Sequence, residues 1–161
     1  MLTVLSLAAC SKGSTVYLNE LPPIYPDYIG VTIPVGIAPM DFNLTGDFDE
    51  VFVEVRGKGG KVFSCRGEYA RFSMRRWRKA VSDAAGDTLV FTVLGKKDRI
   101  WTQFHDFPMY VSSYPLEDYG VTYRKFAPGY ETYSKIGIYQ RNIHNFRETP
   151  IIEGNLIPGQ C

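Results

Sequence analysis

The sequence is poor in the residues that most catalytic and metal sites require. It contains three cysteines and two histidines among 161 residues. Neither His105 nor His144 has a second ligand at metal-binding spacing, and no two cysteines form a C-x-x-C pair. No P-loop, dinucleotide fingerprint or G-x-S-x-G nucleophile motif is present. These gaps predict a protein that is not an enzyme and that binds no cofactor.

The chain also lacks an excess of either charge and any long apolar run. Eighteen Lys and Arg residues stand against 17 Asp and Glu residues, so the formal net charge is +1. Nucleic-acid-binding proteins normally carry a clear basic excess, because phosphate contacts supply most of their affinity. A transmembrane helix needs about 20 consecutive apolar residues, and the sequence has no such run. We therefore expect neither a nucleic-acid partner nor a membrane-spanning helix.

One acidic cluster, formed by Asp47, Asp49 and Glu50, is a candidate site of chemistry. Paired carboxylates can drive glycoside hydrolysis, but acidic residues in a turn are explained equally well by their local hydrogen bonds to the backbone. A calcium loop needs more oxygen ligands at fixed spacing and a closing Glu. The cluster therefore favours a turn over a catalytic or calcium site.

The first ten residues resemble the processing signal of bacterial lipoproteins. Leu7-Ala8-Ala9-Cys10 has the pattern of a lipobox, in which small residues precede an acceptor cysteine. The thiol of that cysteine takes a diacylglycerol, and more than one acyl chain gives stable anchoring where a single chain is marginal. Residues 11–15 (SKGST) have the composition of a flexible tether. We therefore predict lipidation of Cys10 and membrane attachment through this anchor.

The signal departs from the usual pattern in two ways. No Lys or Arg precedes the apolar stretch, and the stretch is shorter than an ordinary signal segment. This leaves open an initiator upstream of Met1. The alternative interpretation is that residues 1–9 form an apolar first strand and that Cys10 is a buried side chain.

The composition of the remainder is typical of a β protein. Eleven Tyr and ten Phe residues are interspersed with 15 Gly and ten Pro residues, as in short strands separated by turns. The strand candidates up to residue 113 are residues 31–34, 37–44, 51–56, 61–65, 88–94, 100–104 and 108–113, with turns at 57–60 and 95–98. Turn signals recur every 8–12 residues or so, which predicts an immunoglobulin or fibronectin type III-like β-sandwich over residues 25–113.

Residues 73–85 interrupt the strand pattern. Ser73 can cap a helix, and Trp77, Val81 and Ala84 recur at the spacing of one helical face. The sequence therefore predicts one inserted short helix that buries Trp77. The rest of its surface is basic, with Arg75, Arg76, Arg78 and Lys79. This surface is interpreted as a solvated face, with an anionic-ligand patch as the alternative.

Residues 114–161 contain three further strand candidates, at 120–126, 130–143 and 146–152. Three strands are too few to bury a separate core, which predicts an incomplete second β domain. Exposed aromatic side chains on a β surface commonly serve docking or sugar stacking. The candidate ligand or partner surface consists of Tyr114, Tyr119, Tyr123, Tyr130, Tyr133 and Tyr139. The alternative is that these tyrosines are ordinary strand residues.

Two stretches carry a family resemblance. The first comprises residues 25–34 (YPDYIGVTIP) and 37–42 (IAPMDF), and the second comprises 128–131 (PGYE), 137–141 (GIYQR) and 150–153 (PIIE). Together they resemble the N-terminal region of Gram-negative envelope proteins described as TolB-like, in which a β module precedes a β-propeller. The resemblance covers nearly all of the chain after Cys10.

In that family, the segment similar to residues 158–161 continues into a C-x-x-C-H haem-attachment motif and then the propeller. The resemblance therefore implies that Cys161 is the remnant of a haem motif. Covalent attachment needs both thiols and the histidine, so Cys161 alone is not expected to hold a haem.

These patterns divide the chain into four parts: a lipoprotein signal remnant (1–9), a tether (10–24), a β-sandwich module (25–113) and the strands of an incomplete, propeller-like β domain (114–161). We expect a non-catalytic cell-envelope lipoprotein module for binding or scaffolding, on the periplasmic or surface face of the outer membrane. One alternative is a carbohydrate-binding surface lipoprotein that uses the tyrosine-rich strands, and another is the N-terminal part of a c-type-haem redox or propeller protein. The expected partners are the membrane through the anchor, a downstream domain or envelope protein, and a glycan.

Overall fold

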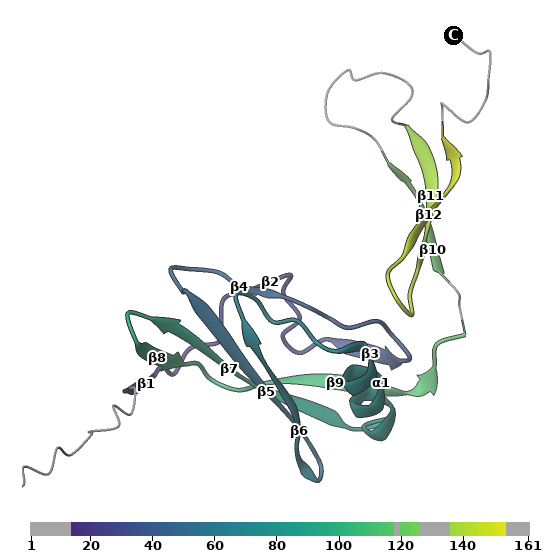
Figure 1. Cartoon of the computed structure of the whole chain (residues 1–161). Coiled ribbons are helices and arrows are strands. Elements are labelled where there is room, and N and C mark those ends of the chain that lie inside the picture. Colours follow the sequence, from purple (N-terminus) through teal and green to yellow (C-terminus); the bar gives the residue numbers. More distant parts are fainter. Residues whose placement is uncertain (1–13, 118–119, 126–135, 154–161) are drawn as a thin grey trace, which may run out of the picture.

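The computed structural model describes residues 14–117, 120–125 and 136–153 (Figure 1). Within these residues strands dominate and α1 (Met74–Asp83) is the only helix, which confirms the expected all-β class with one inserted short helix. No helix in this described part has the length and apolar character to cross a bilayer. The strands are β1 (Thr15–Tyr17), β2 (Ile24–Tyr25), β3 (Thr32–Val35), β4 (Asn43–Leu44), β5 (Glu50–Gly57), β6 (Gly60–Gly67), β7 (Thr88–Lys97), β8 (Ile100–Gln103), β9 (Phe107–Pro115), β10 (Gly120–Lys125), β11 (Gly137–Asn142) and β12 (Glu148–Glu153).

The body, residues 14–117, is built on a seven-stranded sheet in which β7 has three partners. β5 pairs antiparallel along one edge of β7, and β6 continues the sheet beyond β5. Along the other edge, β9 pairs with the first part of β7 and β8 with the last part. The sheet therefore forks, and each branch ends in a parallel strand, β3 beside β9 and β1 beside β8.

The core lies on one face of this sheet, because apolar side chains alternate along its central strands. Phe91 of β7 stacks on Phe107 of β9 with ring centroids 5.2 Å apart. The small sheet of β2 and β4 and the helix α1 add buried side chains to the same cluster, so they cover this face. The central strands contribute Val51, Val53, Val55, Leu89, Phe91, Val93, Phe107, Met109 and Val111.

The helix packs as expected through Trp77, although its start differs in one detail. Trp77 is fully buried, stacks on Phe72 at 5.4 Å, and donates its indole N–H to the carbonyl of Ile37 at 3.0 Å. Ser73 occupies the N-cap position, but its side chain makes no capping hydrogen bond. Its carbonyl instead accepts the first helical bond, from the Trp77 amide at 2.8 Å. The predicted side-chain cap is therefore wrong.

The predicted turn at residues 95–98 is also displaced. β7 continues to Lys97, and the chain reverses at Asp98 and Arg99, whose φ angles of 47° and 70° match a two-residue hairpin turn. Gly95 lies inside the strand because the space beside it is filled. A Cβ atom at Gly95 would lie 2.5 Å from the ring of Phe48. This glycine therefore marks close packing rather than a turn.

The strand predicted over residues 37–44 is reduced to β4, at Asn43–Leu44. The earlier residues hydrogen bond outside any ladder. Ile37 accepts the Trp77 indole N–H, and the Ala38 amide donates to the carbonyl of Ile143 at 2.9 Å. At Ile37 and Ala38, hydrogen bonds to residues distant in sequence therefore take the place of strand pairing.

The tether predicted over residues 10–24 is wrong for its described part. β1 pairs with β8, and the Leu18 amide donates to the Gln103 carbonyl at 2.8 Å. Pro22 and Ile24 are buried in the body. The partners of this segment come from much later in the chain, and only the polar composition of residues 11–15 had suggested a free linker.

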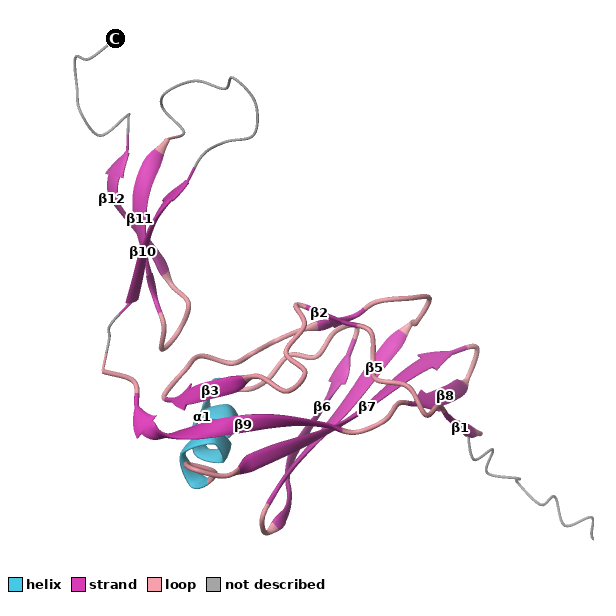
Figure 2. Ribbon diagram, turned by 180° about the vertical axis from the view of Figure 1, so that it is seen from behind, coloured by secondary structure: helices cyan, strands magenta, loops and turns pink. Residues whose placement is uncertain are grey.

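The arm, which we define as β10, β11 and β12, is an antiparallel sheet in that order. It stands away from the body in both views (Figures 1 and 2). β9 runs to Pro115, beyond the predicted domain boundary at 113/114. The large apolar side chains of the arm's strands, namely Val121, Ile138, Ile151 and Ile152, are all exposed.

Trp77→Ala tests the packing of the helix. We expect the free energy of unfolding to fall by about 3–5 kcal/mol, because a large fully buried ring is removed. Urea unfolding followed by circular dichroism measures the loss. Arg75→Ala on the exposed side of the same helix is the control and should change stability by less than about 0.5 kcal/mol. A loss below about 1 kcal/mol in Trp77→Ala would contradict the packing described above.

The arm should open more readily than the body. Its strands bury no large apolar side chain among the described residues, whereas the central strands of the body bury an apolar row. Local opening free energies follow such differences in burial. Hydrogen exchange read by mass spectrometry should show fast exchange in β10–β12 and slow exchange in β5 and β7. Equal protection of both parts in a monomeric sample would show that they form one cooperative unit.

Candidate functional site

The structure brings together two of the six tyrosines of the predicted surface. Tyr123 of β10 and Tyr139 of β11 are register partners in the arm. Tyr114 lies at the end of β9 in the body, where it is 78% exposed. The remaining predicted site residues, Tyr119, Tyr130, Tyr133, Cys10 and Cys161, lie outside the described residues.

The tyrosine face of the arm consists of Tyr123, Lys125, Tyr139, Arg141, Glu148 and Glu153. Side chains alternate along a strand, so register places Tyr123 and Tyr139 on the same side of the sheet. Their ring centroids are 6.4 Å apart with an interplanar angle of 28°. The Tyr123 hydroxyl donates to Glu148, and the Tyr139 hydroxyl donates to Glu153 at 2.6 Å. Both rings are therefore held at their tips as well as by each other.

Cations complete this face. The Lys125 ammonium donates to Glu148 and lies 4.7 Å from the centroid of the Tyr139 ring. The Arg141 guanidinium lies 5.0 Å from the centroid of Phe146. Both distances are within the range of cation–π attraction. The face is thus cross-linked by ion pairs, hydrogen bonds and ring contacts.

The electrostatics of this face centre on Glu148. The hydrogen bond from Lys125, followed by that from Tyr123, holds the pKa of Glu148 below its ordinary value. The same carboxylate raises the pKa of Tyr123 and of Lys125 through these hydrogen bonds. At neutral pH the carboxylate and the ammonium are therefore charged, and the phenol keeps its proton.

Such a surface is suited to recognition. Tyrosine offers a large contact area at a small cost in side-chain entropy and keeps a polar tip for hydrogen bonding. The two rings form a stacked pair with a cation above one of them, rather than a longer flat row. Docking of a polypeptide and sugar stacking on these tyrosines both stay predictions.

The arm contacts the body through the turn between β11 and β12. The imidazole Nδ1 of His144 lies 2.9 Å from the Gly36 carbonyl, and Arg78 donates to the His144 carbonyl at 3.1 Å. Gly36 has a φ of +95°, and a Cβ there would lie 3.3 Å from His144 Nδ1. The absence of a side chain at Gly36 therefore lets the ring approach.

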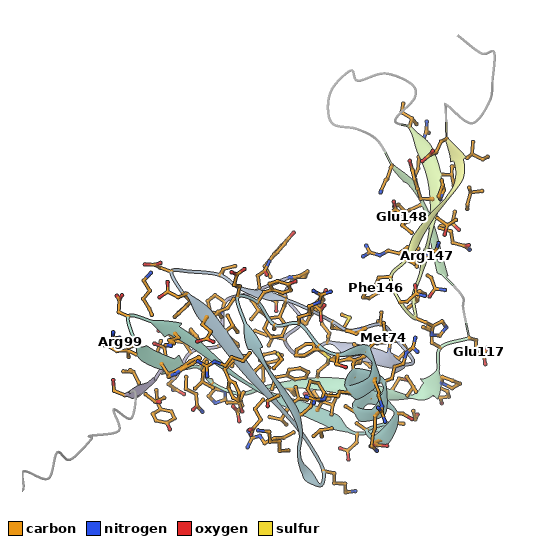
Figure 3. All side chains as sticks on the ribbon, in the orientation of Figure 1. Met74, Arg99, Glu117, Phe146, Arg147 and Glu148 are labelled. Atoms are coloured by element: carbon orange, nitrogen blue, oxygen red, sulfur yellow. The ribbon has the colours of Figure 1, made fainter. Side chains whose placement is uncertain are left out.

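A cavity of about 490 Å³ lies at this junction. Figure 3 shows Met74 of the body and Phe146 of the arm facing this region. Asp41 in its wall accepts a hydrogen bond from the Phe72 amide at 2.8 Å, and burial raises the pKa of its carboxyl group. The lining residues are Ala38, Pro39, Asp41, Arg71, Phe72, Ser73, Met74, Asn145 and Phe146.

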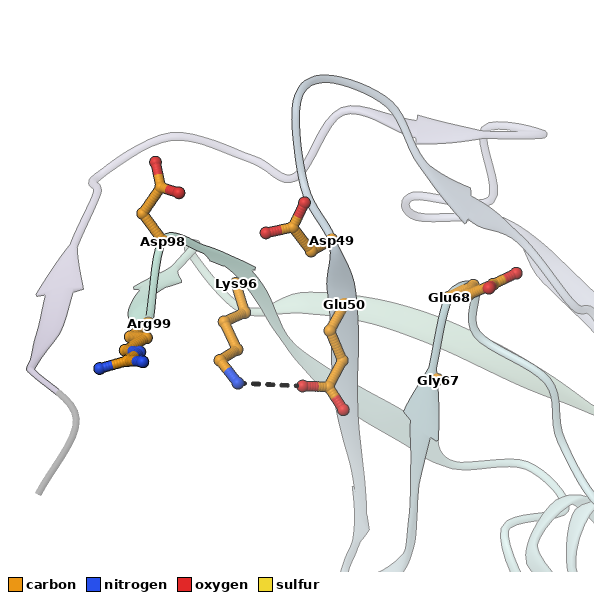
Figure 4. Close-up of a pocket in the computed structure, with 7 residues that line it drawn as sticks. All are labelled: Asp49, Glu50, Gly67, Glu68, Lys96, Asp98 and Arg99. Atoms are coloured by element: carbon orange, nitrogen blue, oxygen red, sulfur yellow. Dashed lines mark hydrogen bonds and ion pairs between the residues drawn. The ribbon is translucent and has the colours of Figure 1, made fainter. Parts of the chain in front are cut away.

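Two of the three acidic residues singled out in the sequence, Asp49 and Glu50, line a hollow of about 610 Å³ on the body (Figure 4). Glu50 accepts a bidentate pair of hydrogen bonds from Arg66, which lowers the pKa of Glu50, and it also pairs with Lys96 at 3.5 Å. Asp47 and Asp49 both bind Lys97. These carboxylates are therefore engaged in surface ion pairs, and Glu50 belongs to strand β5 and not to the predicted turn.

Sequence reasoning missed the aromatic contact beside this hollow. Trp101 meets Phe52 edge-on at 6.5 Å, and the Arg66 guanidinium lies 5.3 Å from its ring centroid. Phe52 alternates with the buried Val51 and Val53 in β5, whereas Trp101 follows the exposed Ile100 in β8. The sequence signal that could have indicated this contact was a large aromatic residue at an outward position of an alternating strand.

The remaining reactive groups have structural roles. Burial raises the pKa of Cys65 to about 11, so its thiol stays protonated at neutral pH and is a poor nucleophile. His105 and His144 each place Nδ1 within 3 Å or so of a backbone carbonyl, at 2.8 and 2.9 Å. Across the part of the chain that the structure describes, no three His, Cys, Asp or Glu side chains gather as metal ligands.

Acid should loosen the arm through Glu148. Its folded pKa is depressed, so the ionised carboxylate stabilises the arm above the ordinary Glu pKa of about 4.3, and this contribution is lost as the pH falls through the lower folded value. Amide chemical shifts of β10–β12 should show this acid transition by NMR. Glu148→Gln should abolish it and should also lower the pKa of Tyr123. Glu153→Gln, the matched control, should keep the Glu148 transition, whereas an unchanged profile in Glu148→Gln would refute the assignment.

The chain was compared with known proteins at three levels. Neither protein-family models nor curated proteins nor solved structures gave a match. The similarity to TolB-like envelope proteins therefore stays a prediction from the sequence. Functional inference for this chain rests on its N-terminal motif and on the geometry of the body and the arm.

Proposed function

We propose that this chain is a non-catalytic lipoprotein module of the bacterial cell envelope that binds or scaffolds a partner through its arm. The anchor in this proposal is a lipidated Cys10, supported by the Leu7-Ala8-Ala9-Cys10 motif. The partner is an envelope protein or a further domain, and the tyrosine face of the arm is its docking surface.

One observation carries the proposal. The first described strand, β1, lies at one end of the body, and the arm leaves the body at the opposite end (Figure 1). An anchor on Cys10 therefore holds one end of the body at the membrane and presents the arm away from it. This is the arrangement that a scaffold requires, because the docking surface stays accessible while the body is fixed.

The arm's construction supports a docking role. Its rings and charges are ordered by contacts within the arm, so little side-chain freedom is left to lose on binding. Tyrosine and arginine are also the residue types enriched where protein partners bind most strongly. Tyr123, Tyr139 and Arg141 are therefore the residues that we assign to partner contact.

The anchor is tested by substitution in a Gram-negative host, using the chain with its own genomic upstream sequence. Wild-type protein should incorporate an alkyne-tagged fatty acid and sediment with membranes. Cys10→Ala should lose both the label and the sedimentation, because no thiol remains to acylate. Cys65→Ala is the matched control, since it removes a half-buried thiol, and it should keep both.

A labelled, membrane-bound Cys10→Ala protein would place the attachment elsewhere. An unlabelled wild-type protein in the soluble fraction would refute the lipoprotein assignment altogether. Either outcome leaves the fold and the arm geometry unaffected, because both are described for residues from Ser14 onwards.

A further inference from the structure

An exposed apolar cluster lies on the body at the β1–β8 edge. Tyr17 is 72% exposed and Leu21 is 52% exposed, and their apolar neighbours are also open to solvent. We define the anchor edge as Val16, Tyr17, Leu18, Leu21 and Ile100. Scattered apolar residues are normal on a surface. Here, however, five exposed ones lie on residues 16–21 and on the neighbouring strand β8, and those of β1 alternate so that they flank both faces of this edge. Such a concentration at one edge points to a contact with another phase or molecule.

The cluster is held rigidly. The Trp101 amide donates to the Ser14 carbonyl at 3.0 Å, and the Leu18 amide donates to the Gln103 carbonyl at 2.8 Å. Further on, the His105 amide donates to the Glu20 carbonyl at 2.8 Å. Residues 14–20 therefore run beside residues 100–105 as an ordered outer strand. Edge strands with exposed apolar side chains are an aggregation hazard unless something covers them.

The cluster is also close to the proposed anchor. Cys10 and Thr15 are five residues apart in the sequence, so their Cα atoms can be separated by at most about 18 Å. The polar headgroup layer takes up about 5–8 Å of this reach. A body tethered so shortly cannot turn freely away from the bilayer, and β1 is the part of it nearest to the attachment point. Figure 3 places Arg99, the neighbour of Ile100, at the same end of the body.

We infer that the anchor edge lies in the membrane interface and fixes the orientation of the body on the bilayer. This inference rests on the proposed anchor at Cys10 and adds a second, non-covalent contact to it. The aliphatic side chains enter the boundary between headgroups and acyl chains. Tyr17 suits the same depth, because its ring is apolar and its hydroxyl can meet the headgroups.

The charge of this edge indicates which lipids it favours. Arg99 is flanked by Asp98, and Glu20 lies further along the edge. The nearby Lys97 is paired with Asp47 at 2.8 Å and Asp49 at 3.1 Å. These carboxylates raise the pKa of Lys97, so it stays protonated, and they balance its positive charge. No basic excess is available among these described residues to attract anionic headgroups. The contact is therefore with the apolar part of the interface and is insensitive to lipid charge.

Photo-crosslinking tests this contact directly. Tyr17 is replaced by a benzophenone-bearing amino acid in full-length Cys65→Ala/Cys161→Ala protein, and a maleimide phospholipid is coupled to Cys10. The conjugate is incorporated into phosphatidylcholine vesicles that contain radiolabelled phosphatidylcholine. The matched control carries the same benzophenone residue at Tyr114, which is 78% exposed but lies at the end of β9.

Position 17 should acquire about tenfold more lipid label than position 114, because only the anchor edge reaches the interface. Addition of phosphatidylglycerol or of salt should leave the yield at position 17 nearly unchanged. Equal label at the two positions would overturn the inference. A crosslink from position 17 to a second copy of the protein would also overturn it, by showing that another chain covers this edge.

The design separates the two proposals. The lipid is attached chemically, so the result at position 17 does not depend on whether cells acylate Cys10. Absence of fatty-acid labelling of the wild-type protein in cells would contradict the proposed lipoprotein function, while the edge contact could still be observed. Labelling in cells without a crosslink at position 17 would keep the anchor and remove the fixed orientation.

Discussion

Strand β7 sets the organisation of the body through its pairing and its alternation. Its ten residues pair with β5 on one edge and with both β9 and β8 on the other. Its inward side chains, Leu89, Phe91 and Val93, are fully buried. A register slip of one residue would turn this row to the solvent. The forked sheet, the position of the aromatic core and the attachment of the arm through β9 all depend on this one register.

The parts of the fold that could be predicted are those that depend on local sequence patterns. Alternating apolar residues predicted β5 and β7, and the spacing of Trp77, Val81 and Ala84 predicted the helix. The failures share a different cause. Gly95 lies in a strand because Phe48 packs against it, and residues 14–24 join the body because of hydrogen bonds to β8. Contacts between residues distant in sequence decided both, and a local pattern does not contain them.

The candidate site was predicted only in part, for the same reason. Tyrosine enrichment pointed to the region that became the arm, and Tyr123 and Tyr139 do share one face. Their ion-pair and hydrogen-bond network needs Glu148 and Glu153, whose place is fixed by the pairing of β11 with β12. The arm thus differs from the body. Polar contacts order the side chains on the surface of the arm, whereas burial of apolar side chains orders the region around β7. The apolar anchor edge was not predicted, because most of its residues lie in the segment that was assigned to the tether.

The short pairing of β1 has a mechanical consequence. A tensile load between a membrane anchor and the arm would enter the body at β1 and leave it at β9. Ladder hydrogen bonds lie across the strand direction, so β9 resists such a pull along its length with bonds to both β3 and β7. β1 has three paired residues and one partner strand. It would peel away first, and each freed residue would lengthen the link by about 3.3–3.6 Å while the aromatic core stayed intact. The first strand would then act as an extensible spacer that limits the force reaching the rest of the fold.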